Sequence, residues 1–256
     1  MTGAADLTLT ALAGVPIVRQ GDDLAEVILN AVARAKTRLE TGDVVVLAQK
    51  IVSKAEGRTV ALSTVVPSPR ALELAAVVNK DARLVELILS ESSEVLRTRP
   101  GIMIVQHRLG FVMANAGIDQ SNIEHTSEEQ ALLLPRDPDA TCAVIRKKLN
   151  AQTDSDVAVL IIDSIGRAWR NGTIGHALGV SGMPGLLDLR GRRDLFGRVL
   201  RATDVGLADE VAAASSLVMG QAAEGRPIVL VRGVPYGRRD GDARELLRPK
   251  SMDLFR

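Results

Sequence analysis

The stretch Val157–Gly172, VAVLIIDSIGRAWRNG, decides the fold and carries the first functional signal. Its first six residues, Val157–Ile162, are all apolar, which is long enough for one buried strand and too short for an independent helix. Because apolar residues do not alternate with polar ones, we expect a strand that is covered on both faces of its sheet. We expect this strand to stop at Asp163-Ser164, so that an acid and a hydroxyl stand where a buried strand ends.

Two glycines and two arginines follow this strand closely, at Gly166, Arg167, Arg170 and Gly172. Oxygen ligands beside a glycine-loosened cationic loop suit hard metal ions and phosphates. The stretch alone favours a simpler interpretation, an ordinary turn in which the acid caps the backbone and the arginines are solvated. Trp169, between the arginines, fits either core packing or a stacking surface.

The composition predicts a globular protein that binds neither nucleic acid nor a membrane. The 256 residues suffice for one large domain or two small ones, with 46% apolar and 25% charged residues. The net charge is +1, from 32 basic and 31 acidic residues, so no strong field would attract nucleic acid or an anionic membrane. Aromatic residues are only 2%, which removes the stacking surfaces that single-strand binders use.

A cytoplasmic location is predicted. The single cysteine, Cys142, cannot form an internal disulfide, which fits a reducing compartment, and we expect it buried on a helix face. No apolar run approaches the roughly 20 residues of a membrane span. The first 14 residues, MTGAADLTLTALAG, carry no positive charge before their apolar part, so no signal peptide is expected.

The remaining patterns predict an α+β fold of mixed sheets with flanking helices, as one unit with one or two lobes. A helix of residues 81–97 is expected to turn Glu86, Glu91 and Glu94 outward. The segment containing Gly175, Gly179, Gly182 and Gly185 is expected to have little helical or strand character, and the charged tail from Gly237 to fray in part. The other expected elements are strands at 7–12, 44–48 and 228–231, a hairpin of 102–105 with 109–113, and helices that start near 22, 70, 139 and 207.

Two polar segments follow expected strands and are candidates for binding. Lys54 lies just past the strand at 44–48, close to a glycine, and could offer a point charge to a phosphate. A solvated loop is the alternative. In the second segment, 114–122, Gly117 would let the backbone approach a ligand closely. Asp119 and Asn122 there supply oxygens for a metal or for a base or ribose edge, unless they are only turn formers.

Several common kinds of site are not expected. The chain contains no G-x-x-x-x-G-K-[ST] phosphate loop, and its glycines lack the dinucleotide-binding spacing. The three histidines, His107, His125 and His176, share no ligand spacing that would indicate zinc. There is no G-x-S-x-G motif, and no neighbour that would activate Cys142, so covalent acyl chemistry is not expected.

Six motifs, in this order, resemble one family, the coenzyme F420-0:L-glutamate ligases (gamma-glutamyl ligases), over nearly the whole chain to about Gly233. In some fused relatives a flavin-binding, nitroreductase-like domain follows; here we expect a single ligase unit over residues 1–256 without it. The motifs are G-V-P at 14–16, G-D-D at 21–23, Gly42-Asp43 with A-Q-K-I-V-S-K-A-E-G-R at 48–58, N-A-G-I-D-Q-S-N at 115–122, D-S-I-G-R-A-W-R-N-G at 163–172, and M-G-Q at 219–221.

The resemblance implies a ligase that adds L-glutamate to coenzyme F420-0, a deazaflavin precursor. GTP would activate the terminal carboxylate of the precursor as an acyl phosphate, which the amino group of glutamate then attacks. Such chemistry needs Mg²⁺ or Mn²⁺, with two divalent ions expected, to bridge phosphate oxygens. Potassium is a further candidate cation, and the family also implies a homodimer.

The resemblance also implies the site residues. Asp119 and Asp163 match metal-binding aspartates, Ser164 stands where a hydroxyl ligand is expected, and Gln221 stands where some relatives have an acid. We add Arg167 and Arg170 as candidates for contacting anionic substrate groups. The nucleotide-binding positions implied are Ala13, Gly14, Val15, Pro16, Gln49, Lys54, Asn122, Met219, Gly220, Gln221, Ala222, Ala223, Glu224, Gly225 and Arg226.

Two other classes of function stay open at this point. One is a metal-dependent phosphohydrolase or phosphotransferase that uses the same carboxylates on another acceptor. The other is a nucleotide-binding protein without turnover.

Overall fold

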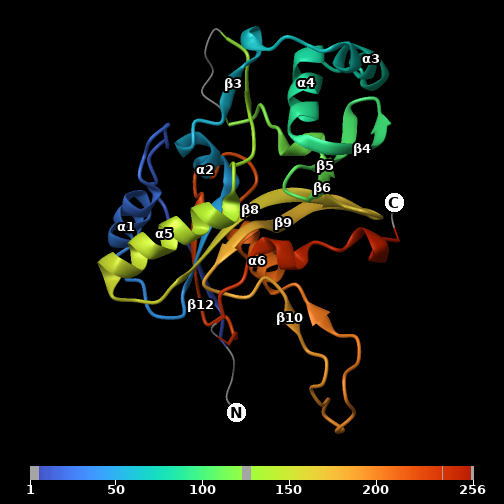
Figure 1. The fold of residues 1–256 in the computed structure, drawn as a ribbon. Helices are drawn as coiled ribbons and strands as arrows, with labels where there is room; N and C mark the ends of the chain where they lie inside the picture. The colour runs from blue at the N-terminus through green and yellow to red at the C-terminus, as the bar shows by residue number, and fades with distance from the viewer. Residues whose placement is uncertain (1–5, 123–127, 238, 255–256) are drawn as a thin grey trace.

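A five-stranded mixed sheet in the order β1-β12-β2-β8-β9 forms the centre of the protein (Figure 1). The computed structural model describes residues 6–122, 128–237 and 239–254. Strands β2 and β8 are parallel neighbours, and the other three pairs are antiparallel. The strands are β1 (Thr8–Ala11), β2 (Val44–Ala48), β8 (Ala158–Arg167), β9 (Arg170–Ser181) and β12 (Ile228–Arg232).

Helices cover both faces of this sheet, which confirms the α+β fold. Along β8, Val159 and Ile161 face the helices α1 (Leu24–Arg34), α2 (Gln49–Ala55) and α5 (Pro138–Thr153). Leu160 and Ile162 face α6 (Leu207–Met219) on the other side. All four side chains are buried, and each contributes about 1.5–3 kcal/mol by leaving water. The prediction of a strand covered on both faces is confirmed.

A smaller set of elements lies beside the main sheet, at the top of Figure 1. Strands β4 (Ser92–Arg99), β5 (Ile102–His107) and β6 (Val112–Ala114) form an antiparallel sheet, which confirms the predicted hairpin. Its apolar side packs on α3 (Pro69–Val78) and α4 (Ala82–Ser90) in a separate core. Strands β3 (Thr59–Ala61) and β7 (Gln130–Leu132) pair nearby, and the short 3₁₀ helices η1 (Leu62–Thr64) and η2 (Asn115–Gly117) complete this part.

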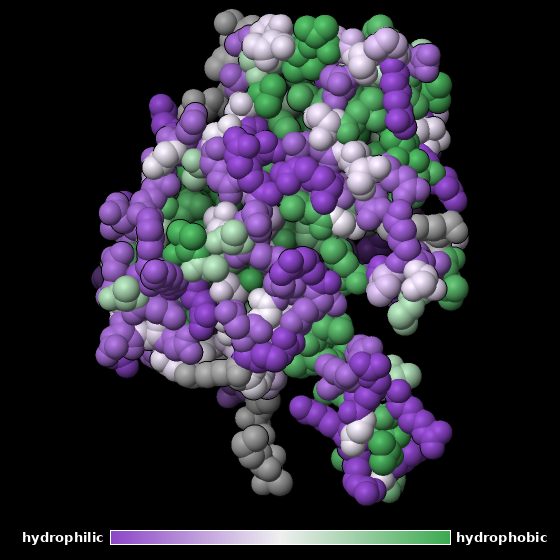
Figure 2. All heavy atoms as spheres, in the orientation of Figure 1, coloured by the Kyte–Doolittle hydropathy of each residue, from purple (hydrophilic) through white to green (hydrophobic). Residues whose placement is uncertain are grey.

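An arm projects from the body between β9 and α6. Its two ends pair as β10 (Leu187–Asp188) and β11 (Asp204–Val205). Figure 2 shows the arm standing away from the rest of the molecule, with apolar side chains among hydrophilic ones. Leu195 and Phe196 are 98% and 96% exposed, so the arm carries large apolar side chains that have no cover within the described protein.

The prediction that the glycine-dense segment 175–185 lacks regular structure is wrong, because β9 runs through Ser181. The strand contains glycines where helices approach it closely. A Cβ atom on Gly175 would lie 2.3 Å from the carbonyl oxygen of Ala212 in α6, and one on Gly179 would lie 2.4 Å from the backbone of Pro138 in α5. Pairing with β9 also carries β8 past its expected end, so that Asp163 and Ser164 lie within the strand.

Two other expectations are corrected. The helix expected at 81–97 ends at Ser90, and residues 92–99 form β4. Glu91, expected on the surface, is 7% exposed and pairs with Arg58 at 2.8 Å. The segment after β2, for which a solvated polar loop was one of two interpretations, begins with the helix α2, whose side chains Ile51 and Val52 are buried in the main core.

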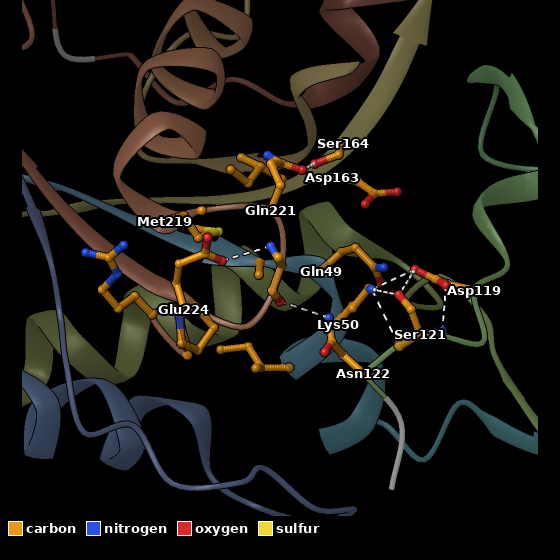
Figure 3. Close-up of a pocket in the computed structure, with 18 of the residues that line it drawn as sticks. Gln49, Lys50, Asp119, Ser121, Asn122, Asp163, Ser164, Met219, Gln221 and Glu224 are labelled. Atoms are coloured by element: carbon orange, nitrogen blue, oxygen red, sulfur yellow. Dashed lines mark hydrogen bonds and ion pairs between the residues drawn. The ribbon is translucent and has the colours of Figure 1, made fainter. Parts of the chain in front are cut away.

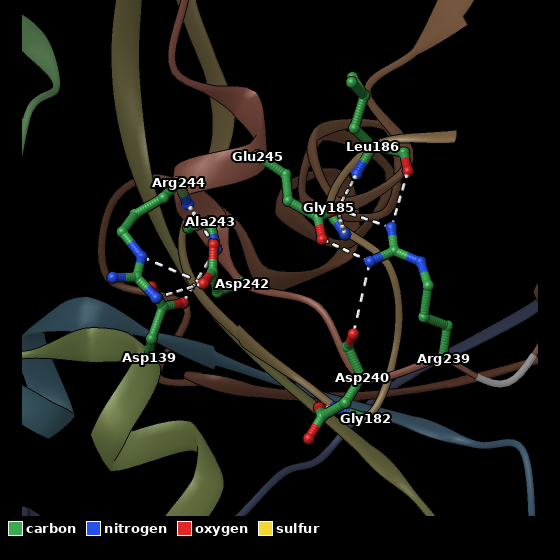
Figure 4. A network of polar contacts seen from close by, with 10 residues as sticks. All are labelled: Asp139, Gly182, Gly185, Leu186, Arg239, Asp240, Asp242, Ala243, Arg244 and Glu245. Atoms are coloured by element: carbon green, nitrogen blue, oxygen red, sulfur yellow. Dashed lines mark hydrogen bonds and ion pairs between the residues drawn. The ribbon is translucent and has the colours of Figure 1, made fainter. Parts of the chain in front are cut away.

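The charged tail packs against the body rather than fraying at its start (Figure 4). Glu245 in η3 (Ala243–Leu246) accepts hydrogen bonds at 3.1 Å from the backbone amides of Gly185 and Leu186. Its other partner is Arg239, at 2.8 Å. These contacts fix the turn from which the arm starts; a last 3₁₀ turn, η4 (Lys250–Met252), follows.

Candidate functional site

The register of the parallel strands β2 and β8 builds one wall of the site. Ala48 ends β2, and its partner Ile162 is the last residue of β8 that pairs with β2. The next residues are therefore neighbours at the cavity: Gln49 begins α2 and Asp163 continues β8, and the Gln49 side chain acts to lower the pKa of Asp163. Two polar side chains thus lie at the point where the pairing of the two buried strands ends.

A cavity of about 670 Å³ lies against this wall (Figure 3). Five separated segments line it: residues 15–18, the start of α2, residues 114–122, residues 162–164 of β8, and residues 216–227, which lead from α6 to β12. A space of this size falls in the range of small-molecule sites. The predicted residues that it brings together are Val15, Pro16, Gln49, Lys54, Asp119, Asn122, Asp163, Ser164 and all of Met219–Arg226.

Four predicted residues are not among those that line the cavity. Ala13 and Gly14 precede its first segment, and the Gly14 carbonyl accepts a hydrogen bond from the Arg34 side chain. Arg167 and Arg170 are partners at the turn between β8 and β9, where Arg167 donates to the Asn171 carbonyl at 3.3 Å. Trp169 at that turn is 87% exposed, which rules out its interpretation as a core residue.

Asp119 is held by a short loop that starts from a strained backbone. Asn115 and Ala116, with φ of 51° and 54°, turn the chain just before it. Its carboxylate accepts hydrogen bonds from the backbone amide of Ser121 at 2.7 Å and from the Ser121 hydroxyl at 2.9 Å. Partial burial raises the pKa of Asp119, but the hydrogen bonds from Lys50 and Ser121 and the Lys50 charge outweigh it, so the pKa is lowered.

Asp163 has the opposite shift. Loss of solvent raises its pKa to about 6, and the negative charge of Asp119 acts in the same direction. The backbone amide of Ser164, the charge of Lys50 and the Gln49 side chain only partly oppose this. A carboxylate that is costly to ionise in the protein alone is one that a bound cation would stabilise.

The segment after α6 faces these acids across the cavity. Gly220 has φ 83° and ψ 170°, a conformation that is essentially restricted to glycine, and it turns the chain out of the helix. The next side chain, Gln221, accepts a hydrogen bond from the Ser164 hydroxyl at 2.6 Å. Two further predicted metal-binding residues are thereby joined at the same cavity.

Basic side chains complete the lining. Lys54 donates to the Asn122 carbonyl at 2.7 Å, and the Asn122 amide donates to the Ala222 carbonyl at 3.3 Å, so that segments far apart in sequence meet at the cavity. Arg226 also lines it, and its buried Nε has no hydrogen-bond partner among the described residues. An unpartnered buried donor beside an open space suits an anionic ligand.

Sequence reasoning missed Lys50 and Ser121. Lys50 forms an ion pair with Asp119 at 2.6 Å and donates to the Ser121 hydroxyl at 2.8 Å. Both residues lie within motifs of the family resemblance and next to predicted site residues: Lys50 follows Gln49, and Ser121 precedes Asn122. The position of Lys50, two residues beyond the end of β2, could have indicated that it belongs to the site.

The cavity does not contain the cluster of three or more histidine, cysteine or acidic side chains by which metal sites are usually identified, among the residues that the structure describes. Within residues 6–122, 128–237 and 239–254, no group of three histidine, cysteine, aspartate or glutamate side chains could hold a metal. His107 is buried beside Glu91, and His125 lies outside the described residues. Any ion here would depend on two carboxylates and neutral oxygens, which is the donor set of magnesium or manganese rather than zinc. Among the described helices, none has the length and apolar character that crossing a membrane requires.

Comparison with known proteins shows the family. A model of the family described as F420-0:Gamma-glutamyl ligase matches residues 14–233. A coenzyme F420:L-glutamate ligase of Methanothermobacter thermautotrophicus is 46% identical over 252 residues, covering 98% of this chain and 99% of the relative. Proteins of the same name from Methanocaldococcus jannaschii and Archaeoglobus fulgidus are 41% and 42% identical, with 94–95% of this chain and 94% of each relative covered. The chain therefore belongs to the F420-0:gamma-glutamyl ligase family.

Proposed function

We propose that this protein joins L-glutamate to coenzyme F420-0 in a GTP-dependent reaction of coenzyme F420 biosynthesis. The observation that carries the proposal is the meeting of Asp119 and Asp163, from separate elements, with Lys50 and Lys54 at one cavity. Anionic oxygens beside ammonium groups suit the binding of a metal–triphosphate pair. The names of the relatives and the family supply the two substrates that are joined.

The proposed reaction has two steps. An oxygen of the precursor carboxylate attacks the γ-phosphorus of GTP, the bond to the bridging oxygen breaks, and GDP leaves. The glutamate nitrogen then attacks the acyl carbon, the carbon–oxygen bond breaks, inorganic phosphate leaves, and the nitrogen loses a proton. This route needs no enzyme nucleophile, which agrees with the state of Cys142: its thiol is buried, and burial raises its pKa.

The oxygen donors at the cavity fit two divalent ions, Mg²⁺ or Mn²⁺. Asp119, Asp163, Ser164 and Gln221 would hold them, and the raised pKa of Asp163 is consistent with a carboxylate that is stabilised by a cation. Bound ions would offset the charge of the phosphoryl group that is transferred. Potassium is a further candidate at the same oxygens.

The nucleotide would lie against Val15, Pro16, Gln49, Lys54, Asn122 and the segment Met219–Arg226, which share the cavity with the two acids. The unpartnered Nε of Arg226 supports an anion here. Ala13 and Gly14 do not line the cavity, and they would contribute by the backbone of the turn that places Val15 and Pro16 there. Arg167 and Arg170 stay candidates for anionic substrate groups at the β8–β9 turn.

The proposal includes a homodimer. The exposed apolar side chains of Leu195 and Phe196 on the projecting arm support a second copy as their cover. Light scattering after gel filtration should give twice the mass of the chain, and replacing both residues by serine should give the monomer.

One assay tests the reaction and separates the alternatives. The protein is supplied with GTP, Mn²⁺, L-glutamate and coenzyme F420-0 whose terminal carboxylate carries heavy oxygen. We expect the glutamyl product by mass spectrometry and one label in the released phosphate. Labels confined to product and water would contradict the acyl phosphate. Phosphate release that ignores glutamate would indicate a phosphohydrolase, and binding of GTP without turnover a nucleotide-binding protein.

A further inference from the structure

The carboxylate of Asp119, a proposed metal ligand, is already engaged by donors from the chain on both oxygens (Figure 3). One oxygen accepts the Ser121 amide at 2.7 Å. The other accepts the Ser121 hydroxyl at 2.9 Å and the Lys50 ammonium at 2.6 Å. Lys50 also donates to the Ser121 hydroxyl at 2.8 Å, so its ammonium lies inside the same small network.

Lys50 serves both acids of the site. Its hydrogen bond and charge lower the pKa of Asp119, and its charge also lowers the pKa of Asp163. The Lys50 side chain is 24% exposed and extends from the first turn of α2 into the cavity. In the protein alone, this ammonium therefore supplies positive charge at the place where the proposed divalent ions would supply it.

An ammonium and a divalent ion compete for this carboxylate. Two unit charges about 4 Å apart interact by about 4 kcal/mol at an effective dielectric constant of 20, and a divalent ion doubles that repulsion. An ion on the Asp119 oxygen that now accepts from Lys50 would therefore push the ammonium away. Lysine has a flexible four-carbon stem, so its ammonium can move to another anion while its backbone stays in the helix.

We propose that Lys50 is an exchangeable counter-cation: it neutralises Asp119 when no ion is bound, and moves to a nucleotide phosphate when a divalent ion takes its place. The inference rests on the proposed function, because it requires the metal and the triphosphate to share the cavity. Lys50 would be a positioning residue with opposite effects on two ligands. Its positive charge weakens the binding of the metal alone and strengthens the binding of the metal–nucleotide pair.

The sign of the first effect gives the test. Mn²⁺ is titrated into the protein without nucleotide, with the free ion followed by electron paramagnetic resonance, for the wild type, Lys50→Met and Lys50→Gln. We expect both variants to bind Mn²⁺ about tenfold more tightly, a difference of about 1.4 kcal/mol. In the presence of saturating Mn²⁺, we expect both to bind GTP about tenfold or more weakly. The matched control is Lys54→Met on the same helix, whose ammonium contacts a backbone carbonyl; it should leave the Mn²⁺ affinity within about twofold.

The outcomes separate this inference from the proposed function. Asp119→Asn serves as the reference for the site. If Mn²⁺ binding depends on Asp119 but is unchanged or weaker in both Lys50 variants, the exchange is overturned while the metal site stands. If Mn²⁺ binding is the same with and without Asp119, the proposed metal site fails, and the exchange fails with it. Methionine and glutamine are both neutral but differ in polarity, so one of the two Lys50 variants still measures the effect of the charge if the other disturbs the fold.

Discussion

Ala48 and Ile162 are the last partners in the parallel pairing of β2 with β8, so the residues that follow them, Gln49 and Asp163, lie side by side at the wall of the cavity. Parallel strands bring the carboxyl ends of distant segments to one edge of a sheet, where ligands commonly bind. This chain has the arrangement without the G-x-x-x-x-G-K-[ST] sequence of a phosphate loop. The acid is thus fixed by the register of the sheet rather than by a flexible loop.

The first prediction concerns Asp163→Asn. The amide keeps the shape of the side chain but cannot neutralise a cation, so metal-dependent turnover should fall by about a hundredfold or more. Because burial raises the pKa of Asp163 to about 6, its charge disfavours the folded state at pH 7. The free energy of unfolding should therefore rise, by on the order of 1 kcal/mol. Turnover and urea unfolding measured at pH 7 check both, and near-normal activity would count against the site.

The second prediction concerns Lys54→Ala. The ammonium lines the cavity and contacts the Asn122 carbonyl at 2.7 Å, so its loss should lower turnover about tenfold. A partly exposed lysine contributes little to folding, and the free energy of unfolding should change by less than about 1 kcal/mol. Lys148→Ala is the control, because this lysine pairs with Asp23 at 2.6 Å outside the cavity. Equal losses of activity in both variants would remove Lys54 from the site.

Most strands of the main sheet could be predicted because each is a continuous apolar run, which indicates burial without knowledge of the rest of the chain. The apolar runs at 44–48, 157–162 and 228–231 became β2, β8 and β12, and the stripe on α1 became core. Strand β9 could not be predicted, since Gly175 and Gly179 look like loop residues until α6 and α5 are seen to lie against them. The predicted helix 81–97 is longer than α4, because the sequence does not show that Glu91 is buried against partners in distant segments, such as Arg58.

The site shows the same division. The resemblance supplied Asp119, Asp163 and most of the lining, because these residues occur in motifs that are contiguous in sequence. Lys50 was overlooked because its importance comes from Asp119 and Ser121, and Ser121 is 71 positions away. Only the three-dimensional arrangement shows that Lys50, on the first turn of α2, forms an ion pair with Asp119.

The third prediction concerns Gly220→Ala. At φ 83° and ψ 170° any side chain is strained, by about 1–3 kcal/mol, and the new Cβ would lie 2.3 Å from the Glu224 side chain. The Glu224 carboxylate would then lose the hydrogen bond that it accepts from the Ala222 backbone amide at 2.8 Å, and the cavity wall would shift. We expect lower stability and a higher KM for GTP. Gly191→Ala on the arm, with φ 85° and open space around it, should lose stability with KM unchanged; the same KM in both variants would contradict the prediction.

The last prediction concerns stability at low pH and the buried acid Glu91. Burial by itself raises the pKa of this carboxyl, but the close approach of His107 and Arg58 and the charges of Arg58 and Arg108 outweigh it and hold the pKa at about 2. The distances to Arg58 and Arg108 are 2.8 and 3.0 Å. Since the folded pKa lies below the ordinary value of 4.5, Glu91 stabilises the fold above about pH 4.5, and this contribution is lost as the pH falls toward 2.

Glu91→Gln should therefore lower the free energy of unfolding at pH 7 by on the order of 3 kcal/mol, because it leaves the arginines without their counter-charge. The difference between the wild type and the variant should shrink as the pH falls, with more than half of it lost by about pH 3. Urea unfolding of both proteins at a series of pH values measures this difference directly, since the other carboxylates cancel. Glu94→Gln, at an exposed position that pairs with Lys250, is the control and should show little difference at any pH. A difference for Glu91→Gln that stays constant from pH 7 to about pH 3 would show that the carboxylate acts through its shape rather than its charge.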